Sequence, residues 1–166
     1  DPPEKMYADA DQMMSAGKYE AAASKFEELD RSHPYSPEAR RAMVLAAYAY
    51  YKAGKTPEAI ASAERYTVMH PGTKDAPFAH HIIGSAYFDD MKGANRDQGT
   101  TRKALDQYKI LKTRYPDSKY AEQADNRSDD HNNAQPGEKR THDSTSFGWV
   151  MGDSKNSGVP SLEQGA

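Results

Sequence analysis

Apolar residues along the first part of the chain recur at steps of three and four, the spacing that places them on one face of an α-helix. The first stripe is formed by Met6, Ala10, Met13 and Met14. It predicts a helix from about Pro3 to Ala16, which Gly17 then ends as a left-handed C-cap. A second stripe predicts a helix over 19–31, so residues 3–31 are expected to form a helical hairpin.

The same pattern returns twice further along the chain. Helices are predicted at 39–53 and 57–69, which form a second hairpin. A third hairpin opens at about Pro77, but its second helix is not expected before about Thr101. The intervening residues 91–100 contain Gly and Asp and are typical of a loop, and a loop inserted between two helices leaves the packing of a repeat intact.

A short turn motif separates the hairpins. It consists of a ring residue, a proline and, two positions later, a hydroxyl, and it occurs as His33-Pro34-Tyr35-Ser36, His70-Pro71-Gly72-Thr73 and Tyr115-Pro116-Asp117-Ser118. Because proline has no backbone N–H to continue a helix, each copy is expected to follow a helix end. Each hydroxyl is expected to accept a hydrogen bond from the first turn of the next helix. Recurrence at intervals of about 40 residues is typical of stacked helical repeats.

Composition separates this repetitive body from a polar tail. The chain has 166 residues, a net charge of −3 and a mean hydropathy of −1.00. We predict a helical-repeat domain at 1–125 and a tail at 126–166 that is too polar to pack well. A native disordered tail, an extension from an expression vector and a frameshifted translation of a longer protein all remain open. Neither part has the basic surplus that is typical of nucleic-acid binding.

Residue types that are missing narrow the choice of function. The chain has no cysteine, which excludes disulfides, thiolate catalysis and cysteine zinc sites. Its apolar runs fall far short of the roughly 20 residues that a membrane-spanning helix needs. The chain begins at Asp1 without methionine, signal peptide or lipid-acceptor cysteine, so we interpret it as a processed form or an expressed fragment.

The sequence offers little chemistry for catalysis. His80 and His81 are adjacent, so on a helix they point about 100 degrees apart and cannot share a metal on one face. His81 could approach Asp89, but a metal needs additional convergent ligands. There is no nucleophile motif and no glycine-rich phosphate loop. We therefore expect no metal, no cofactor and no enzymatic activity.

The hairpins resemble tetratricopeptide repeats. That motif places a glycine near the end of its first helix, then an aromatic residue, a small alanine, a second aromatic residue and a proline. The matching residues are Gly17, Tyr19, Ala22, Phe26 and Pro34, then Gly54, Ala59, Ala63 and Pro71, and then Gly84, Tyr87, Ala104, Tyr108 and Pro116. The resemblance implies an all-α fold, a right-handed superhelix of helical hairpins, whose concave surface is lined by the first helix of each hairpin.

Less generic segments resemble the BamD family of outer-membrane assembly lipoproteins. They are residues 2–7, 47–54, 95–98 and 114–121, and the similarity covers about residues 2–127, the first half of such a protein. The resemblance implies a periplasmic, lipid-anchored component of the machinery that inserts β-barrel proteins into the outer membrane. The family continues with further repeats that contribute to docking on the barrel-forming partner BamA, and that docking region is expected to be incomplete here.

Projecting the repeat register onto the concave surface selects a candidate groove for an extended peptide. Its residues are Tyr7, Arg41, Leu45, Tyr48, Tyr51, Phe78, His81, Ile82 and Phe88. Aromatic rings suit a peptide with alternating large side chains, such as the C-terminal strand of an unfolded barrel protein that the resemblance implies as ligand. We expect Arg41, Lys52 or His81 to meet the terminal carboxylate of such a peptide.

Two other readings of this stripe remain open. Aromatic residues at helical spacing also pack against a neighbouring hairpin, and about half of those named here would do so. A generic cell-envelope adaptor would instead bind folded partners through its convex face. The Lys, Arg and Asn clamp with which another tetratricopeptide class holds acidic C-termini is not found at the corresponding positions, which argues against that class.

Overall fold

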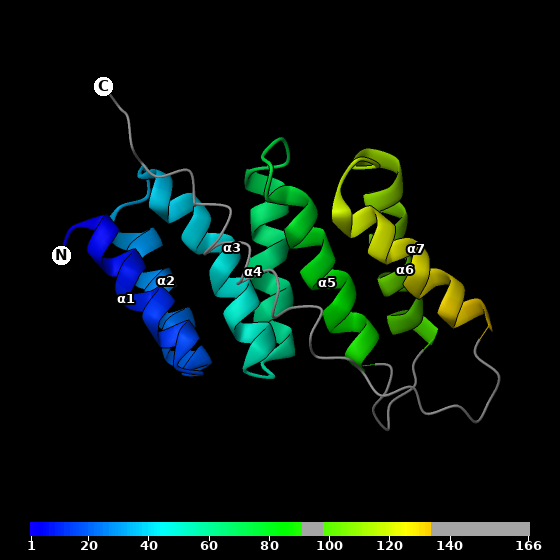
Figure 1. The fold of residues 1–166 in the computed structure, drawn as a ribbon, viewed down its shortest axis with the longest axis horizontal. Helices are drawn as coiled ribbons and strands as arrows, with labels where there is room; N and C mark the ends of the chain where they lie inside the picture. The colour runs from blue at the N-terminus through cyan, green and yellow to red at the C-terminus, as the bar shows by residue number, and fades with distance from the viewer. Residues whose placement is uncertain (91–97, 134–166) are drawn as a thin grey trace. The chain divides into compact units, whose positions relative to one another are not determined.

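The computed structural model describes residues 1–90 and 98–133, apart from the side chains of residues 98 and 129–133. These residues form seven α-helices and no β-strand (Figure 1): α1 (Pro3–Ser15), α2 (Tyr19–Ser32), α3 (Pro37–Lys52), α4 (Thr56–Met69), α5 (Ala76–Asp90), α6 (Gln98–Arg114) and α7 (Lys119–Asn133). The all-α fold predicted from the sequence is confirmed. Among the helices described, none has the length and apolar character needed to span a membrane.

The first six helices pair as three hairpins. Helix α1 packs on α2, α3 on α4, and α5 on α6. Successive hairpins join through α2 against α3 and α4 against α5, while the first helices α1, α3 and α5 also contact one another in that order. Figure 1 shows these helices side by side in chain order. The arrangement is that of tetratricopeptide-like hairpins, and the right-handed superhelix stays a prediction.

Two glycines end the first helices of the first two hairpins. Gly17 and Gly54 have φ angles of 75° and 76°, in the left-handed region that glycine adopts without steric cost. In both hairpins the N–H of the following lysine donates to a carbonyl five residues earlier, at 2.9 Å. This is the bond that closes a helix at a left-handed cap, and the predicted role of Gly17 is confirmed.

Two of the three predicted hydroxyl caps are present. The Ser36 Oγ accepts a hydrogen bond from the Ala39 N–H at 3.1 Å, in the first turn of α3. The Ser118 Oγ accepts from the Ala121 N–H at 3.2 Å, in the first turn of α7. Each serine thereby pairs a backbone donor that the helix itself leaves without a partner.

The prediction was wrong for the hydroxyl of the middle turn. The Thr73 Oγ1 lies 2.7 Å from the Tyr66 hydroxyl and donates to the His70 carbonyl at 2.9 Å. The backbone carbonyl of Thr73, and not its side chain, accepts from the Ala76 N–H at 3.1 Å. A buried tyrosine next to this turn competes for the hydroxyl, and sequence spacing gives no sign of it.

Small and apolar residues lie where the hairpins pack most closely. The alanines matched to the repeat motif are buried with at most 1% exposure: Ala22, Ala59, Ala63 and Ala104. Helices α3 and α5 are buried on most of their circumference, and in α5 every residue from Ala76 to Ala86 is buried. These two helices have a neighbour on several sides, because each contacts its hairpin partner, the preceding hairpin and another first helix.

Some boundaries differ from the predicted ones. Helix α3 begins at Pro37, before the predicted start at residue 39, and α6 begins at Gln98 rather than at about Thr101. Helix α7 continues to Asn133, past the boundary predicted at residue 125. Residues 1–132 form one compact unit. The predicted loop at 91–100 lies largely outside the described residues, as does most of the predicted tail at 126–166.

Candidate functional site

The nine predicted groove residues come from three helices that contact one another. Helix α1 contributes one residue and helices α3 and α5 contribute four each: Tyr7, then Arg41, Leu45, Tyr48 and Tyr51, then Phe78, His81, Ile82 and Phe88. Because α3 contacts both α1 and α5, the structure places these residues on adjoining helices. They divide into a buried and a partly exposed set.

Five of the nine are buried. Their exposed fractions are 5% or less: Leu45, Tyr48, Phe78, His81 and Ile82. The rings of Tyr48 and Phe78 lie with centroids 5.7 Å apart and join α3 to α5. A peptide could contact these five side chains only if the groups that cover them moved. Their role in binding stays a prediction.

Tyr120 of α7 extends this aromatic cluster and was missed by the sequence analysis. Its ring stacks on Phe78 with centroids 5.6 Å apart and lies 4.7 Å from the His81 ring. Tyr120 follows the third turn motif by two residues, in the helix that the motif precedes. Extending the repeat register into this helix would have placed Tyr120 on the same row of helices.

The buried histidine carries no charge at neutral pH. Burial lowers the pKa of His81 to about 3, and the positive charges of Arg127 and Lys119 act in the same direction. A neutral imidazole cannot form an ion pair with a peptide carboxylate. Lys52, the second cation considered for that role, has its ammonium 5.6 Å from the ring centroid of Tyr19 in α2.

Arg41 is the predicted cation best placed to meet a ligand. Its side chain is 28% exposed and forms an ion pair with Asp75, in the turn before α5. Burial raises the pKa of Tyr7, while the charge of Arg41 and its hydrogen bond to the phenol oppose that rise. Arg41 therefore contacts groups from the first and third hairpins. A guanidinium has five N–H donors, which is more than a single carboxylate such as that of Asp75 uses.

The other partly exposed residues lie further along α3 and α5. The Tyr51 hydroxyl donates to the Asp89 carboxylate. Burial, followed by the negative charge of Asp89, raises the pKa of Tyr51. Phe88 lies beneath the guanidinium of Arg127, 5.4 Å from its ring centroid. Tyr51 and Phe88 therefore form a second half-buried aromatic region, beside an anionic and a cationic group.

Arg127 was also missed, although it organises the contacts of α7. Its Nη1 donates to the Ser85 Oγ at 2.7 Å and to the Tyr108 hydroxyl at 3.4 Å. It thereby joins α7 to both helices of the third hairpin. Sequence gave no signal for it, because the apolar pattern that defined the earlier helices ends before residue 127.

The nine predicted residues are mainly aromatic and apolar, with one partly exposed arginine. Among the side chains of residues 1–90 and 99–128, no three of His, Asp or Glu come together as a metal site would require. His80 is engaged by the Gln107 Oε1 at 2.8 Å from its Nδ1. The fold defines a helical-repeat protein of the tetratricopeptide type.

Comparison with known proteins narrows that class to one family. A sequence model of the family YfiO, described as outer membrane lipoprotein, matches residues 1–135. The chain therefore belongs to this family of outer-membrane lipoproteins, as predicted from the sequence. The match extends somewhat beyond the predicted limit at about residue 127.

Relatives that share one name come from several bacteria. The outer membrane protein assembly factor BamD of Caulobacter vibrioides is 33% identical over 123 residues, which are 74% of this chain and 40% of that protein. The factor of the same name from Neisseria gonorrhoeae is 31% identical over 131 residues, covering 73% of this chain and 49% of that protein. The one from Xylella fastidiosa strain 9a5c is 29% identical, with 74% and 46% covered.

Family membership places the protein at the periplasmic face of the outer membrane. The relatives are named as assembly factors and not as enzymes, in agreement with the expected lack of catalytic activity. The chain spans about half, or less, of the length of the relatives described above.

Proposed function

We propose that the described helices are the N-terminal part of an assembly factor that holds extended segments of unfolded outer-membrane β-barrel proteins. The observation that carries the proposal is the row of aromatic residues and Arg41 on α1, α3 and α5, in a chain whose relatives are named outer membrane protein assembly factors. The complete protein would carry a lipid anchor ahead of Asp1. It would dock on a BamA-like subunit through repeats that follow those described.

The burial of five predicted residues changes how such a groove would work. Tyr7, Arg41, Tyr51 and Phe88 are only half-buried and would contact the peptide directly. The buried rings would hold the helices at the spacing that the groove requires. For this reason replacing Tyr48 and Phe78 by alanine is a poor test, since each truncation would cost roughly 3–5 kcal/mol in stability alone.

A sharper test uses Arg41 and a synthetic peptide of alternating apolar residues that ends in an aromatic residue. Arg41→Gln should weaken binding of the free-carboxylate peptide roughly tenfold or more, because a hydrogen bond to a charged group contributes about 1.5–3 kcal/mol. Arg41→Lys should keep most of the affinity. Fluorescence anisotropy of the labelled peptide measures the dissociation constant.

Two controls separate carboxylate recognition from general damage. Arg31→Gln removes an arginine whose side chain is 70% exposed at the end of α2, and it should leave binding unchanged. An amidated peptide should bind the unaltered protein about as weakly as the free peptide binds Arg41→Gln. The unaltered protein and Arg41→Gln are each measured with the free and with the amidated peptide. Equal affinity in all four measurements would contradict the assignment of Arg41. An adaptor that recognises only folded partners would bind neither peptide.

A further inference from the structure

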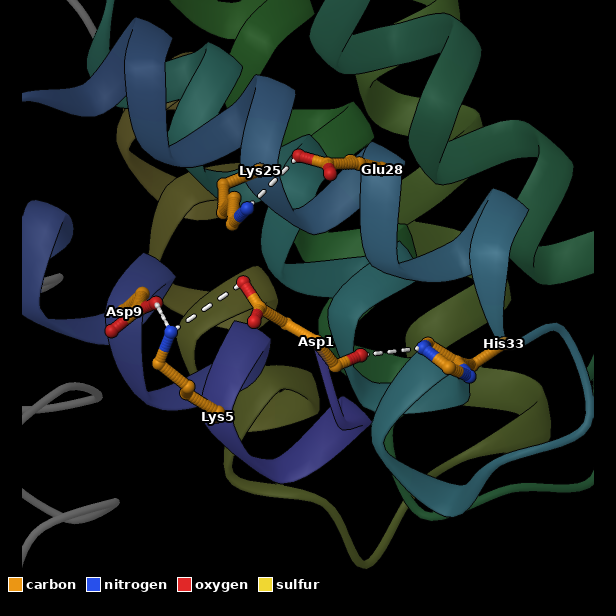
Figure 2. Close-up of polar contacts among 6 residues, drawn as sticks. All are labelled: Asp1, Lys5, Asp9, Lys25, Glu28 and His33. Carbon is orange, nitrogen blue, oxygen red and sulfur yellow. Dashed lines mark hydrogen bonds and ion pairs between the residues drawn. The ribbon is translucent and has the colours of Figure 1, made fainter.

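All three turn motifs lie at one edge of the hairpins, together with the start of the chain. The His33 Nε2 lies 2.9 Å from the Asp1 carbonyl oxygen (Figure 2), which joins the first turn to the beginning of α1. The Tyr115 hydroxyl donates to the Pro71 carbonyl at 2.8 Å, which joins the third turn to the second. We call this the proline-turn edge: residues 33–36, 70–73 and 115–118 with the helix ends that adjoin them.

The large apolar side chains that the described residues expose to solvent are all at this edge. Tyr35, in the first turn, is 99% exposed. Val68 and Met69, the last two residues of α4, are 80% and 52% exposed. A single exposed apolar side chain is common on protein surfaces. These three, however, are all at one edge, and grouped exposed apolar residues mark a surface that contacts a membrane or a partner protein.

The polar groups at the edge fit a lipid surface. Tyrosine is favoured where a membrane meets water, because its ring is apolar and its hydroxyl is not. Exposed cations adjoin each turn: Arg31 before the first, Lys74 after the second and Arg114 before the third. Asp117 is an exposed acidic residue in the third turn. Lys and Arg near a membrane are attracted to anionic head groups.

The start of the chain is held at the same edge. The contact of His33 with the Asp1 carbonyl places the start of the chain beside the first proline turn, and Lys5 forms ion pairs within the same segment with Asp1 and Asp9, at 3.4 and 4.0 Å (Figure 2). A lipid attached ahead of Asp1, as in the function proposed above, would therefore keep the proline-turn edge near the membrane. The edge then needs only weak contacts to lie on it, because the anchor supplies the attachment.

We propose that the proline-turn edge rests on the phospholipid surface of the membrane. Tyr35, Val68 and Met69 enter the head-group region, and the neighbouring cations contact lipid phosphates. The anchor fixes the protein to the membrane, and this edge fixes its orientation, with the turns between α1 and α2 and between α3 and α4 pointing away from the lipid.

The test attaches the protein to a lipid chemically, so it does not depend on natural lipidation or on peptide binding. The chain contains no cysteine and one tryptophan, Trp149. A cysteine added before Asp1 couples the full chain to a maleimide lipid in vesicles of phosphatidylethanolamine and phosphatidylglycerol. In a Trp149→Phe background, Tyr35→Trp reports contact with lipid. Its emission should shift to shorter wavelength and be quenched when the vesicles contain lipids with brominated acyl chains.

The matched control is Lys18→Trp, an exposed position in the turn between α1 and α2, at the opposite edge. Its emission should be neither shifted nor quenched. Adding Val68→Ser and Met69→Ser to the Tyr35→Trp chain should reduce quenching at position 35. Both serines replace exposed side chains, and circular dichroism confirms that the helices remain.

Two results would overturn the proposal: equal quenching at positions 18 and 35, or no quenching at position 35. In the second case the indole introduced by Tyr35→Trp would stay in water beside a tethered membrane. The exposed apolar side chains of the proline-turn edge would then be assigned to a protein partner instead of to lipid.

Discussion

At the scale of single residues, Gly84 of α5 packs closely against Tyr108 of α6. A Cβ added to Gly84 would lie 2.7 Å from the Tyr108 Cε1. The ring cannot easily move, because Tyr108 is 1% exposed and its hydroxyl donates to the Gly84 carbonyl at 3.3 Å. The glycine matched to the third repeat is therefore required for packing, whereas Gly17 and Gly54 are required for a left-handed backbone.

Gly84→Ala should destabilise the protein by about 1 kcal/mol, because overpacking usually costs roughly 1–3 kcal/mol and the gain in helix propensity offsets about 1 kcal/mol of that. Urea unfolding followed by circular dichroism measures the change. Gly72→Ala is the control, because a Cβ there meets nothing within 4 Å. A variant at position 84 as stable as the one at position 72 would show that the two helices separate at little cost.

His81 should make stability fall as the solution becomes acidic. Its pKa is about 3 in the folded protein because of burial, against about 6.5 when unfolded. Below about pH 6.5 the unfolded chain binds a proton that the folded protein does not, so stability declines by up to about 1.4 kcal/mol per pH unit down to about pH 3. The lowered pKa of buried His80 acts in the same direction.

The slope of stability against pH tests this prediction. His81→Gln removes the titrating ring, so its free energy of unfolding should fall less steeply between about pH 7 and pH 5 than that of the unaltered protein. The slope is compared, and not the level, because the substitution also removes ring contacts with Tyr120. Parallel slopes would mean that His81 becomes protonated without unfolding.

At the scale of elements, the turn motif stabilises the protein through the N-cap of the following helix. Ser36→Ala should lower stability by about 1 kcal/mol, the usual value of a serine N-cap. Ser24→Ala is the matched control, since the exposed Ser24 hydroxyl donates to the Glu20 carbonyl within α2 and caps nothing. Equal midpoints of urea unfolding for the two variants would contradict this role of the Ser36 hydroxyl.

Helices and turns were predictable because their signals are local. A proline with a hydroxyl two residues later marks a boundary whatever lies around it, and Ser36 and Ser118 cap as predicted. Thr73 did not, because the Tyr66 hydroxyl reaches it across the turn. The apolar pattern predicts that Tyr66 faces inward, but it does not predict that the Tyr66 hydroxyl lies within hydrogen-bonding distance of Thr73.

At the scale of the whole molecule, the sequence predicted the row of helices better than the accessibility of its side chains. The repeat register correctly assigned Tyr48 and Phe78 to neighbouring first helices, whose rings do meet. The ring of Phe78 is covered partly by Tyr120, which belongs to α7 in a later repeat. A residue's exposure in a repeat protein is set by the next repeat, so it cannot be inferred from its own.

The nearly continuous burial of α5 also bears on how the protein is made. A helix with apolar residues around most of its circumference has no face of its own to present to water. A chain emerging into the periplasm with α5 complete and α6 still to come would expose the surface that α6 later covers. That interval is the moment at which this protein would itself need a chaperone, or would aggregate.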